Sequence, residues 1–302
     1  MTAVAYEEGS FLASGGVALF RRSWRAERPT AALINLHGLG DRSGLYAPLT
    51  ESFAREGIAV HGLDLRGHGR SPGPRAYVGR WDDYLDDLAA FARWVTDRES
   101  GLPLFVLGHS LGGLIALDYA IHRPGGLVGV IAAAPPLGEV GVPPVLMTLG
   151  RVMARVWPRF SLNVGMDLTG LSRNPAVVET ITGDPLFHRK GTARLAVAVP
   201  DAIARVHRDA GELRVPVLLL HGTADRMVPL EGTRAFYERL GGSAAGRLDA
   251  PAVSGESAKQ SGRREPDAEL RVYDGAYHAI FFDDDGERVM ADVVRWIRDH
   301  AR

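Results

Sequence analysis

The sequence predicts an α/β fold in which a mainly parallel sheet is covered by helices on both faces. Short apolar runs alternate with segments of helical periodicity along most of the 302 residues, and this alternation is typical of strand–helix–strand units. In addition, Ser110 stands between the apolar run Leu104–Leu107 and a helical pattern. Such a strand-to-helix turn projects a serine hydroxyl from the edge of a parallel sheet. The chain is long enough for a full-sized core in one domain, either alone or with an inserted cap.

The elements are expected in the following order. Beta-type runs at Phe11–Leu12 and Val17–Phe20 flank the turn Ser14–Gly16 and predict an N-terminal hairpin. Continuous apolar runs, typical of strands buried on both faces, follow at Ala32–Leu36, Ala59–Leu63, Leu104–Leu107, Val128–Ala132, Val217–Leu220 and Leu270–Tyr273. Helical periodicity is found at Tyr46–Glu56, Trp81–Asp97, Leu111–Arg123, Leu230–Leu240 and Glu287–His300.

A long insertion interrupts this pattern. About eighty residues separate the strand that ends near Ala134 from the one that begins near Val215, whereas a usual connection has two to six. Apolar residues recur there at helical spacing: Val145, Leu146, Leu149, Val152, Met153 and Val156. Such a stripe either covers a pocket or packs inside the core, because periodicity does not say what a stripe faces. We expect a core domain at 1–137 and 206–302 and a lid at 138–205, with Val145, Leu149 and Met153 as candidates for substrate contact.

A second segment, 241–267, is rich in Gly, Ser, Ala, Pro and charged residues and is nearly free of large apolar ones. Such a composition cannot bury enough apolar surface to order itself. We therefore expect a disordered surface loop within the core domain.

Composition argues against several classes of function. The net charge is −1, and Lys190 and Lys259 are the only lysines, so no basic tract indicates nucleic-acid binding. Without cysteine there is no disulfide, no thiolate metal site and no cysteine nucleophile. The first residues carry acids and precede no long apolar run, and prolines interrupt the apolar stretch 127–149. We therefore expect neither a signal peptide nor a membrane span, and a cytoplasmic protein.

Three residues are candidates for nucleophilic catalysis. A serine needs a base within hydrogen-bond reach and a carboxylate to orient that base. Asp225 and His278 each follow an apolar strand, so both belong to the sheet edge that carries Ser110. The order serine, aspartate, histidine is the one expected for this type of turn. Alternatively, Ser110 is a helix N-cap, Asp225 a turn residue and His278 a solvated loop histidine.

Other motifs follow strands at the same edge. His37–Asp41 follows the first apolar strand, and the amides of Leu39 and Leu111 are the natural pair to stabilise an oxyanion. The alternative for His37-Gly38 is a tight turn in which only the glycine matters.

The loop Asp64–Ser71 is interpreted as a structural turn. Helix-dipole stabilisation and solvation explain the acidic cluster, which comprises Asp82, Asp83, Asp86 and Asp87.

Five motifs carry a family resemblance: His37–Tyr46, Asp64–Ser71, Gly108–Gly113, Gly222–Asp225 and Gly275–His278. Together they resemble the α/β-hydrolase fold and, within it, the monoacylglycerol lipase and lysophospholipase group, over nearly the whole chain except 241–267. The resemblance implies that Ser110 is the nucleophile, Asp225 and His278 its partners, and Leu39 and Leu111 the oxyanion amides. It also implies a lid from about residue 138 to 200. The chain departs from the pattern at Asp41-Arg42, where members often have Glu-His, and at Leu111, where methionine is common.

We thus expect a serine ester hydrolase that works through an acyl-enzyme and needs neither cofactor nor metal, because the triad and the amides supply nucleophile, base and charge stabilisation. A fatty-acyl ester such as a monoacylglycerol is the favoured substrate, and transient contact of the lid with a membrane surface is compatible with this. Lysophospholipase, short-chain or aryl esterase, thioesterase and carbon–carbon hydrolase activities remain as alternatives, and so does a non-enzymatic binding protein. Ser110 excludes the chemistry of haloalkane dehalogenases and epoxide hydrolases, which need an aspartate at this position.

Overall fold

The computed structural model describes residues 3–138, 144–163, 165, 167–242, 247–248 and 267–301, with only the backbone for 144–147 and 247–248. The nine described strands of its main sheet lie in the order β1-β2-β4-β3-β5-β6-β9-β11-β10. Strands β1 (Val4–Leu12) and β2 (Ala18–Ala26) form an antiparallel hairpin, and β2 pairs antiparallel with β4. All other neighbours are parallel: β3 (Ala31–Leu36), β4 (Ile58–Leu63), β5 (Leu104–His109), β6 (Leu127–Ala133), β9 (Val217–Gly222), β10 (Arg247–Leu248) and β11 (Ala268–Tyr273).

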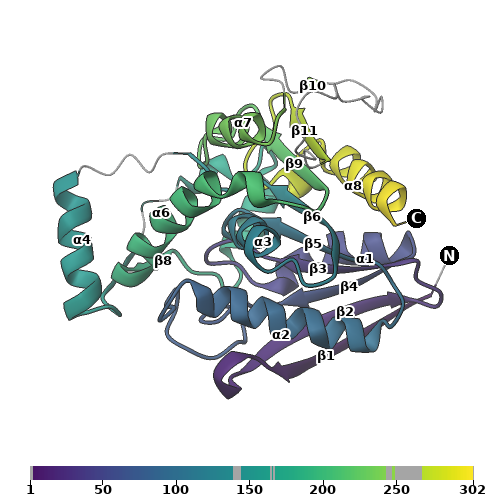
Figure 1. Ribbon diagram of the computed structural model, residues 1–302, viewed down its shortest axis with the longest axis horizontal. Helices are drawn as coiled ribbons and strands as arrows, with labels where there is room; N and C mark the ends of the chain where they lie inside the picture. The colour runs from purple at the N-terminus through teal and green to yellow at the C-terminus, as the bar shows by residue number, and fades with distance from the viewer. Residues whose placement is uncertain are drawn as a thin grey trace.

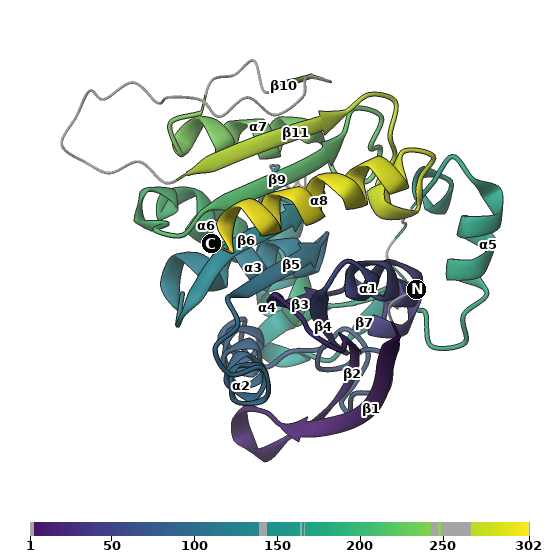
Figure 2. The same ribbon diagram turned by 90° about the vertical axis from the view of Figure 1, so that its right-hand side faces the viewer.

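Helices cover both faces of the sheet (Figures 1 and 2). Side chains alternate between the faces along each strand, so Val106 of β5 belongs to one buried cluster while Phe105 and Leu107 belong to the other. The first cluster includes residues of α2 (Asp82–Arg98), α3 (Leu111–His122) and α7 (Leu230–Arg239). The second includes α1 (Ala47–Arg55) and α8 (Gly286–His300). The predicted α/β class with helices on both faces is confirmed.

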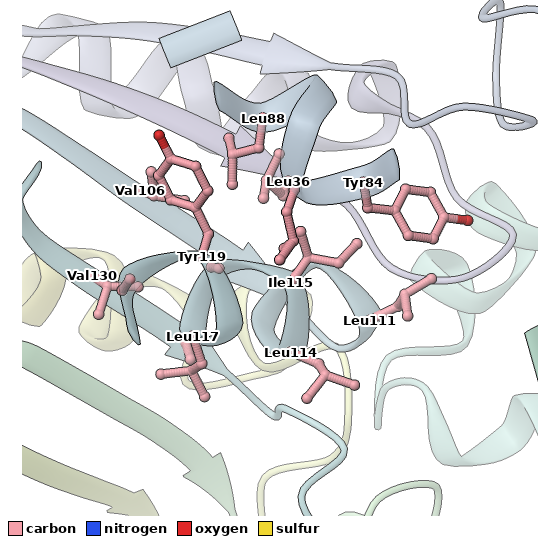
Figure 3. Packing of buried hydrophobic residues seen from close by; sticks show 14 of the residues in the cluster. Leu36, Tyr84, Leu88, Val106, Leu111, Leu114, Ile115, Leu117, Tyr119 and Val130 are labelled. Carbon is pink, nitrogen blue, oxygen red and sulfur yellow. The ribbon is translucent and has the colours of Figure 1, made fainter. Parts of the chain in front are cut away.

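Helix α3, which begins directly after Ser110, is buried around its whole circumference. Figure 3 shows Ile115 of this helix directed toward Leu36 of β3 and Leu88 of α2, while Leu114 and Leu117 project from the opposite side of the helix. A helix that is apolar on all sides belongs in the interior of an α/β protein. The turn that carries Ser110 is therefore anchored at both ends, by a central strand and by the most buried helix.

The six predicted strands and five predicted helices are confirmed with shifts of a few residues at their ends. The hairpin is also confirmed, but β1 begins at Val4, well before the predicted Phe11. This edge strand is mostly exposed, so its residues show no apolar pattern. Arg21 and Arg22 of β2 are buried and form ion pairs with Glu7 and Glu8 of β1. Because these charged residues lack an apolar pattern, this part of the hairpin resembles a polar loop in the sequence.

The insertion between β6 and β9 has its own secondary structure: α4 (Pro144–Val156), β7 (Ser161–Asn163), the short helical turn η3 (Leu168–Gly170), α5 (Pro175–Thr182), β8 (Lys190–Thr192) and α6 (Ala193–Arg208). Strands β7 and β8 form a separate antiparallel pair. Helix α4 packs on α6 at one end of the molecule (Figure 1). Because Leu149, Val152 and Val156 of α4 are 57%, 50% and 78% exposed, its interpretation as a core helix is wrong.

Helix α6 runs across the expected boundary at residue 205. Both halves of the helix contribute to the first buried cluster, through Leu195, Ala202, Ile203 and Val206. The predicted disordered loop at 241–267 lies almost entirely outside the described residues, so that prediction stays open.

Two polar motifs of the sequence have structural roles. Asp64 is fully buried and accepts hydrogen bonds from the amides of Ser43 (2.7 Å) and Arg70 (2.8 Å), which confirms a structural turn. Asp87 is only 1% exposed and forms a two-pronged ion pair with Arg66 (2.6 and 2.9 Å). Solvation and the helix dipole therefore do not explain Asp87, and that interpretation is wrong for this member of the acidic cluster.

Within the described ranges, no helix is long and apolar enough to cross a membrane. In the same part of the chain, no group of three or more His, Asp or Glu side chains is arranged to hold a metal ion.

Candidate active site

Ser110 lies on a strained turn between β5 and α3. Its backbone has φ 52° and ψ −120°, a conformation that a residue with a Cβ rarely adopts. The Ser110 amide donates to the carbonyl of Ala133 on the neighbouring strand (2.9 Å), while its own carbonyl accepts from Gly113 (2.8 Å) and Leu114 (3.1 Å). The Ser110 side chain makes no capping bond. The N-cap alternative is therefore wrong, and the hydroxyl is not used to hold the helix.

The flanking glycines are required by close backbone contacts. A Cβ on Gly108 would lie 2.1 Å from the carbonyl oxygen of Gly112, and a Cβ on Gly112 would lie 2.5 Å from the carbonyl oxygen of Leu36. Both distances are far below van der Waals contact, and both clashes involve backbone. The strand, the turn and the helix thus pass each other too closely for any side chain.

Asp225 and His278 are brought together from the loops after β9 and β11. The Nδ1 atom of His278 lies 2.7 Å from Oδ2 of Asp225, a hydrogen bond between two buried side chains. The other oxygen, Oδ1, accepts from the amides of Met227 (2.8 Å) and Val228 (2.9 Å). Asp225 is therefore both a turn residue and the partner of His278, so the two interpretations of it are compatible, whereas the solvated-loop alternative for His278 is wrong.

The environment keeps Asp225 ionised. Burial alone would raise its pKa, but the hydrogen bonds from His221 and His278 outweigh burial and hold the pKa well below the usual value. His221, on β9, reaches within 3.3 Å of the same Oδ2 atom. A negative Asp225 fixes the ring of His278 with Nδ1 protonated and leaves Nε2 available as a base.

His109, the last residue of β5, supports the backbone of His278. Its Nε2 atom donates to the backbone carbonyl of His278 (3.0 Å), and its Nδ1 atom lies 2.7 Å from the hydroxyl of Tyr46, which in turn lies 3.0 Å from Oδ2 of Asp41. Burial, followed by the nearby His278, lowers the pKa of His109 to about 3. His109 is therefore neutral at neutral pH. Only its position beside Ser110, on a buried strand, could have indicated this role.

The loop after β3 lies against the Ser110 turn. A Cβ on Gly38 would come within 3.3 Å of the Ser110 Cβ, which shows how closely the loop passes. Leu39 and Leu111 both line the cavity, and among the described residues the amide of neither donates a hydrogen bond to another group. The side chain of His37 is buried and accepts from the amide of Leu65 (2.9 Å). The histidine therefore holds the loop, and the alternative in which only the glycine matters is wrong.

One cavity of about 800 Å³ joins these groups, a size typical of small-molecule sites. Ser110 and His278 lie on its wall. The insertion supplies much of the apolar lining: Leu149, Met153, Phe160, Leu162, Leu168, Leu171, Phe187, Leu195 and Val199. The predicted contacts Leu149 and Met153 thus border the cavity, whereas the side chain of the third candidate, Val145, lies outside the described part. Polar side chains are few: among them are Asp41, Asp167, Thr192 and Arg226.

Comparisons with known proteins agree with this geometry. The sequence profile of the family described as serine aminopeptidase, S33, matches residues 27–250. The chain is 29% identical to a monoacylglycerol lipase of Mycolicibacterium smegmatis over 99% of this chain and 100% of that protein. It is 32% identical to the human monoglyceride lipase, covering 88% of this chain and 81% of that protein. The crystal structure of the Paleococcus ferrophilus monoacylglycerol lipase superposes with a TM-score of 0.77 at 33% identity, over 93% of this chain and 99% of that one.

Proposed function

Since the chain belongs to the serine aminopeptidase S33 family and is a carboxylic-ester hydrolase, we propose that it hydrolyses monoacylglycerols through an acyl-enzyme on Ser110. The observation that carries the proposal is the buried 2.7 Å bond between Asp225 and His278 beside the strained Ser110 turn, in one apolar cavity. The relatives named monoacylglycerol lipase and monoglyceride lipase support the substrate class.

The proposed reaction has two halves. Nε2 of His278 takes the proton of Ser110 as Oγ attacks the ester carbonyl, and the amides of Leu39 and Leu111 hold the resulting oxyanion. As the tetrahedral intermediate collapses, the carbon–oxygen bond to the alcohol breaks and His278 returns the proton to the leaving glycerol oxygen. A water molecule then attacks the acyl-enzyme with His278 again as base, which releases the fatty acid and restores Ser110.

The insertion 138–205 is proposed to be a lid that receives the acyl chain. Met153 of α4 borders the cavity, whereas the neighbouring Val152 is half exposed. A Met153→Trp variant should fill part of the cavity, lower the hydrolysis of long-chain monoacylglycerols, and spare acetyl and butyryl esters. Val152→Trp is the matched control, because it adds the same ring on the outer face of the helix. Equal chain-length profiles for the two variants would contradict the lid assignment.

The outer face of the insertion is proposed to touch lipid surfaces. It exposes Val152, Val156 and Trp157 by half or more, together with Leu149 and Leu162, which also border the cavity. Scattered exposed apolar residues are common, but a group of this kind on neighbouring elements marks an interaction surface. We expect Trp157→Ser to reduce co-flotation with phosphatidylcholine vesicles. Leu12→Ser, which alters a residue of β1 that is more exposed than Trp157 (75% against 59%), should leave co-flotation unchanged. Equal binding by both variants would remove the proposal.

The decisive test compares hydrolysis rates for monoacyl-, diacyl- and lysophospho-glycerols of graded chain length. We expect monoacylglycerols with medium or long chains to be the best substrates, and Ser110→Ala to lower kcat by at least about a thousandfold. A preference for acetyl esters would favour the short-chain esterase alternative. A fluorophosphonate probe that labels the wild type but not Ser110→Ala would identify the nucleophile.

A further inference from the structure

The loop that carries His278 is bound to the insertion by backbone hydrogen bonds. The amide of His278 donates to the carbonyl of Gly170 (3.2 Å), and the amide of Ala279 donates to that of Leu171 (2.7 Å). Gly170 and Leu171 belong to the segment around η3, far from His278 in the sequence. The backbone of His278 is thus held by its amide from the insertion and by its carbonyl from His109.

Asp283, five residues after His278, joins the same two segments through its side chain. Its Oδ2 atom accepts from the amide of Tyr277 (2.8 Å) and from Nε of Arg173 (2.9 Å). Its Oδ1 atom accepts from the amide of Arg173 (2.8 Å) and lies 3.2 Å from the hydroxyl of Ser172. The carboxylate of Asp283 therefore binds both Tyr277, the residue directly before His278, and the consecutive residues Ser172 and Arg173 of the insertion.

This arrangement requires a charged carboxylate. The Asp283 side chain is fully buried, and three N–H donors converge on it. Burial raises the pKa of Asp283, but the amides of Tyr277 and Arg173 and the guanidinium of Arg173 outweigh it, so the pKa is lowered. An amide in the same place would turn an N–H group toward one pair of donors and leave those donors unsatisfied.

Asp285 offers a natural comparison. It also accepts from Arg173 (2.7 Å), but through the outer guanidinium nitrogen and from a partly exposed position. No hydrogen bond links the Asp285 side chain to the His278 loop in the described part of the chain. The two aspartates share Arg173 and differ in the contact with Tyr277.

We propose that Asp283 is a positioning residue for the histidine of the triad: it clamps segment 170–173 of the insertion to the His278 loop and so fixes where His278 meets Asp225. The proposal deepens the function proposed above and rests on it. It implies that a displacement of the insertion is transmitted to the catalytic base, because both sides of the clamp move together. A shift of the His278 backbone moves its ring relative to Asp225, and small misplacements of a catalytic group are costly.

The test compares Asp283→Asn with Asp285→Asn, using active-site titration with a fluorophosphonate so that rates refer to active molecules. For a short soluble ester, Asp283→Asn should lower kcat by about ten- to a hundredfold with KM nearly unchanged. The downfield proton resonance of His278 Nδ1, assigned by its loss in Asp225→Asn, should shift or broaden. Asp285→Asn should keep both the rate and the resonance of the wild type.

A second variant keeps the proposal testable if Asp283→Asn does not fold. Arg173→Met removes one donor from Oδ2 but keeps the backbone bond to Oδ1, and it should give a smaller loss of kcat with a displaced resonance. Wild-type kcat and resonance in a folded Asp283→Asn or Arg173→Met, with only a lower Tm, would overturn the proposal. If the wild type hydrolyses no ester, the proposed function fails, whereas the resonance still decides the role of Asp283.

Discussion

Replacing Ser110 by glycine should make the protein more stable than replacing it by alanine, and we expect both variants to be inactive. At φ 52° and ψ −120°, alanine keeps the strain of a side chain in this conformation, which costs about 1–3 kcal/mol. Glycine removes the strain but loses about 0.5–1 kcal/mol through its greater freedom in the unfolded chain. We therefore expect Ser110→Gly to exceed Ser110→Ala by about 1 kcal/mol in free energy of unfolding.

Urea unfolding followed by circular dichroism measures this difference, which corresponds to roughly 1.5 °C in Tm for a chain of 302 residues. A matched pair without catalytic function lies at the end of β6. Ala134 has a φ of 46°, whereas the φ of its neighbour Ala133 is not positive. Both side chains are fully buried. Ala134→Gly should therefore cost less than Ala133→Gly. If Ser110→Gly is no more stable than Ser110→Ala, the turn stores no strain and the reasoning is refuted.

Three further predictions concern the surroundings of the site. Gly112→Ala should abolish stable folding or activity, measured by Tm and ester hydrolysis, because its Cβ would lie 2.5 Å from the carbonyl oxygen of Leu36. Burial lowers the pKa of His109 to about 3, so the neutral ring stabilises the fold fully above the unfolded pKa of about 6.5, and this stabilisation is lost as the pH falls from 6.5 toward 3. In urea titrations, the difference in free energy of unfolding between wild type and His109→Asn should therefore shrink by about 2 kcal/mol from pH 7.5 to pH 5. A difference that does not change with pH would argue against a buried neutral ring. Arg42→Lys should lower the free energy of unfolding by about 1–2 kcal/mol, since lysine cannot reproduce the two-pronged pair with Asp184 that ties the loop after β3 to the insertion; unchanged stability would show that this pair contributes little.

The elements of the core could be predicted because their signals are local. A buried parallel strand is a short apolar run, and a helix is a periodic stripe, so neither needs information from distant residues. The failures also have physical reasons. The edge strand β1 is exposed and ion-paired, so it resembles a loop in sequence, and Asp87 resembles a solvated acid because its partner Arg66 lies on another segment.

The sequence by itself determined the type of site, because Ser110, Asp225 and His278 each follow a strand of one parallel sheet, and the carboxyl ends of such strands meet at one edge. Only the tertiary structure decided what holds that site in place. His109 and His278 are 169 positions apart, and Arg173 and Asp283 are 110 apart, so no local pattern connects them. Their contacts depend on how the insertion and the last loop pack against the core. The same long-range packing decides what the apolar stripe of α4 faces, because Leu149 and Met153 of this helix border the cavity.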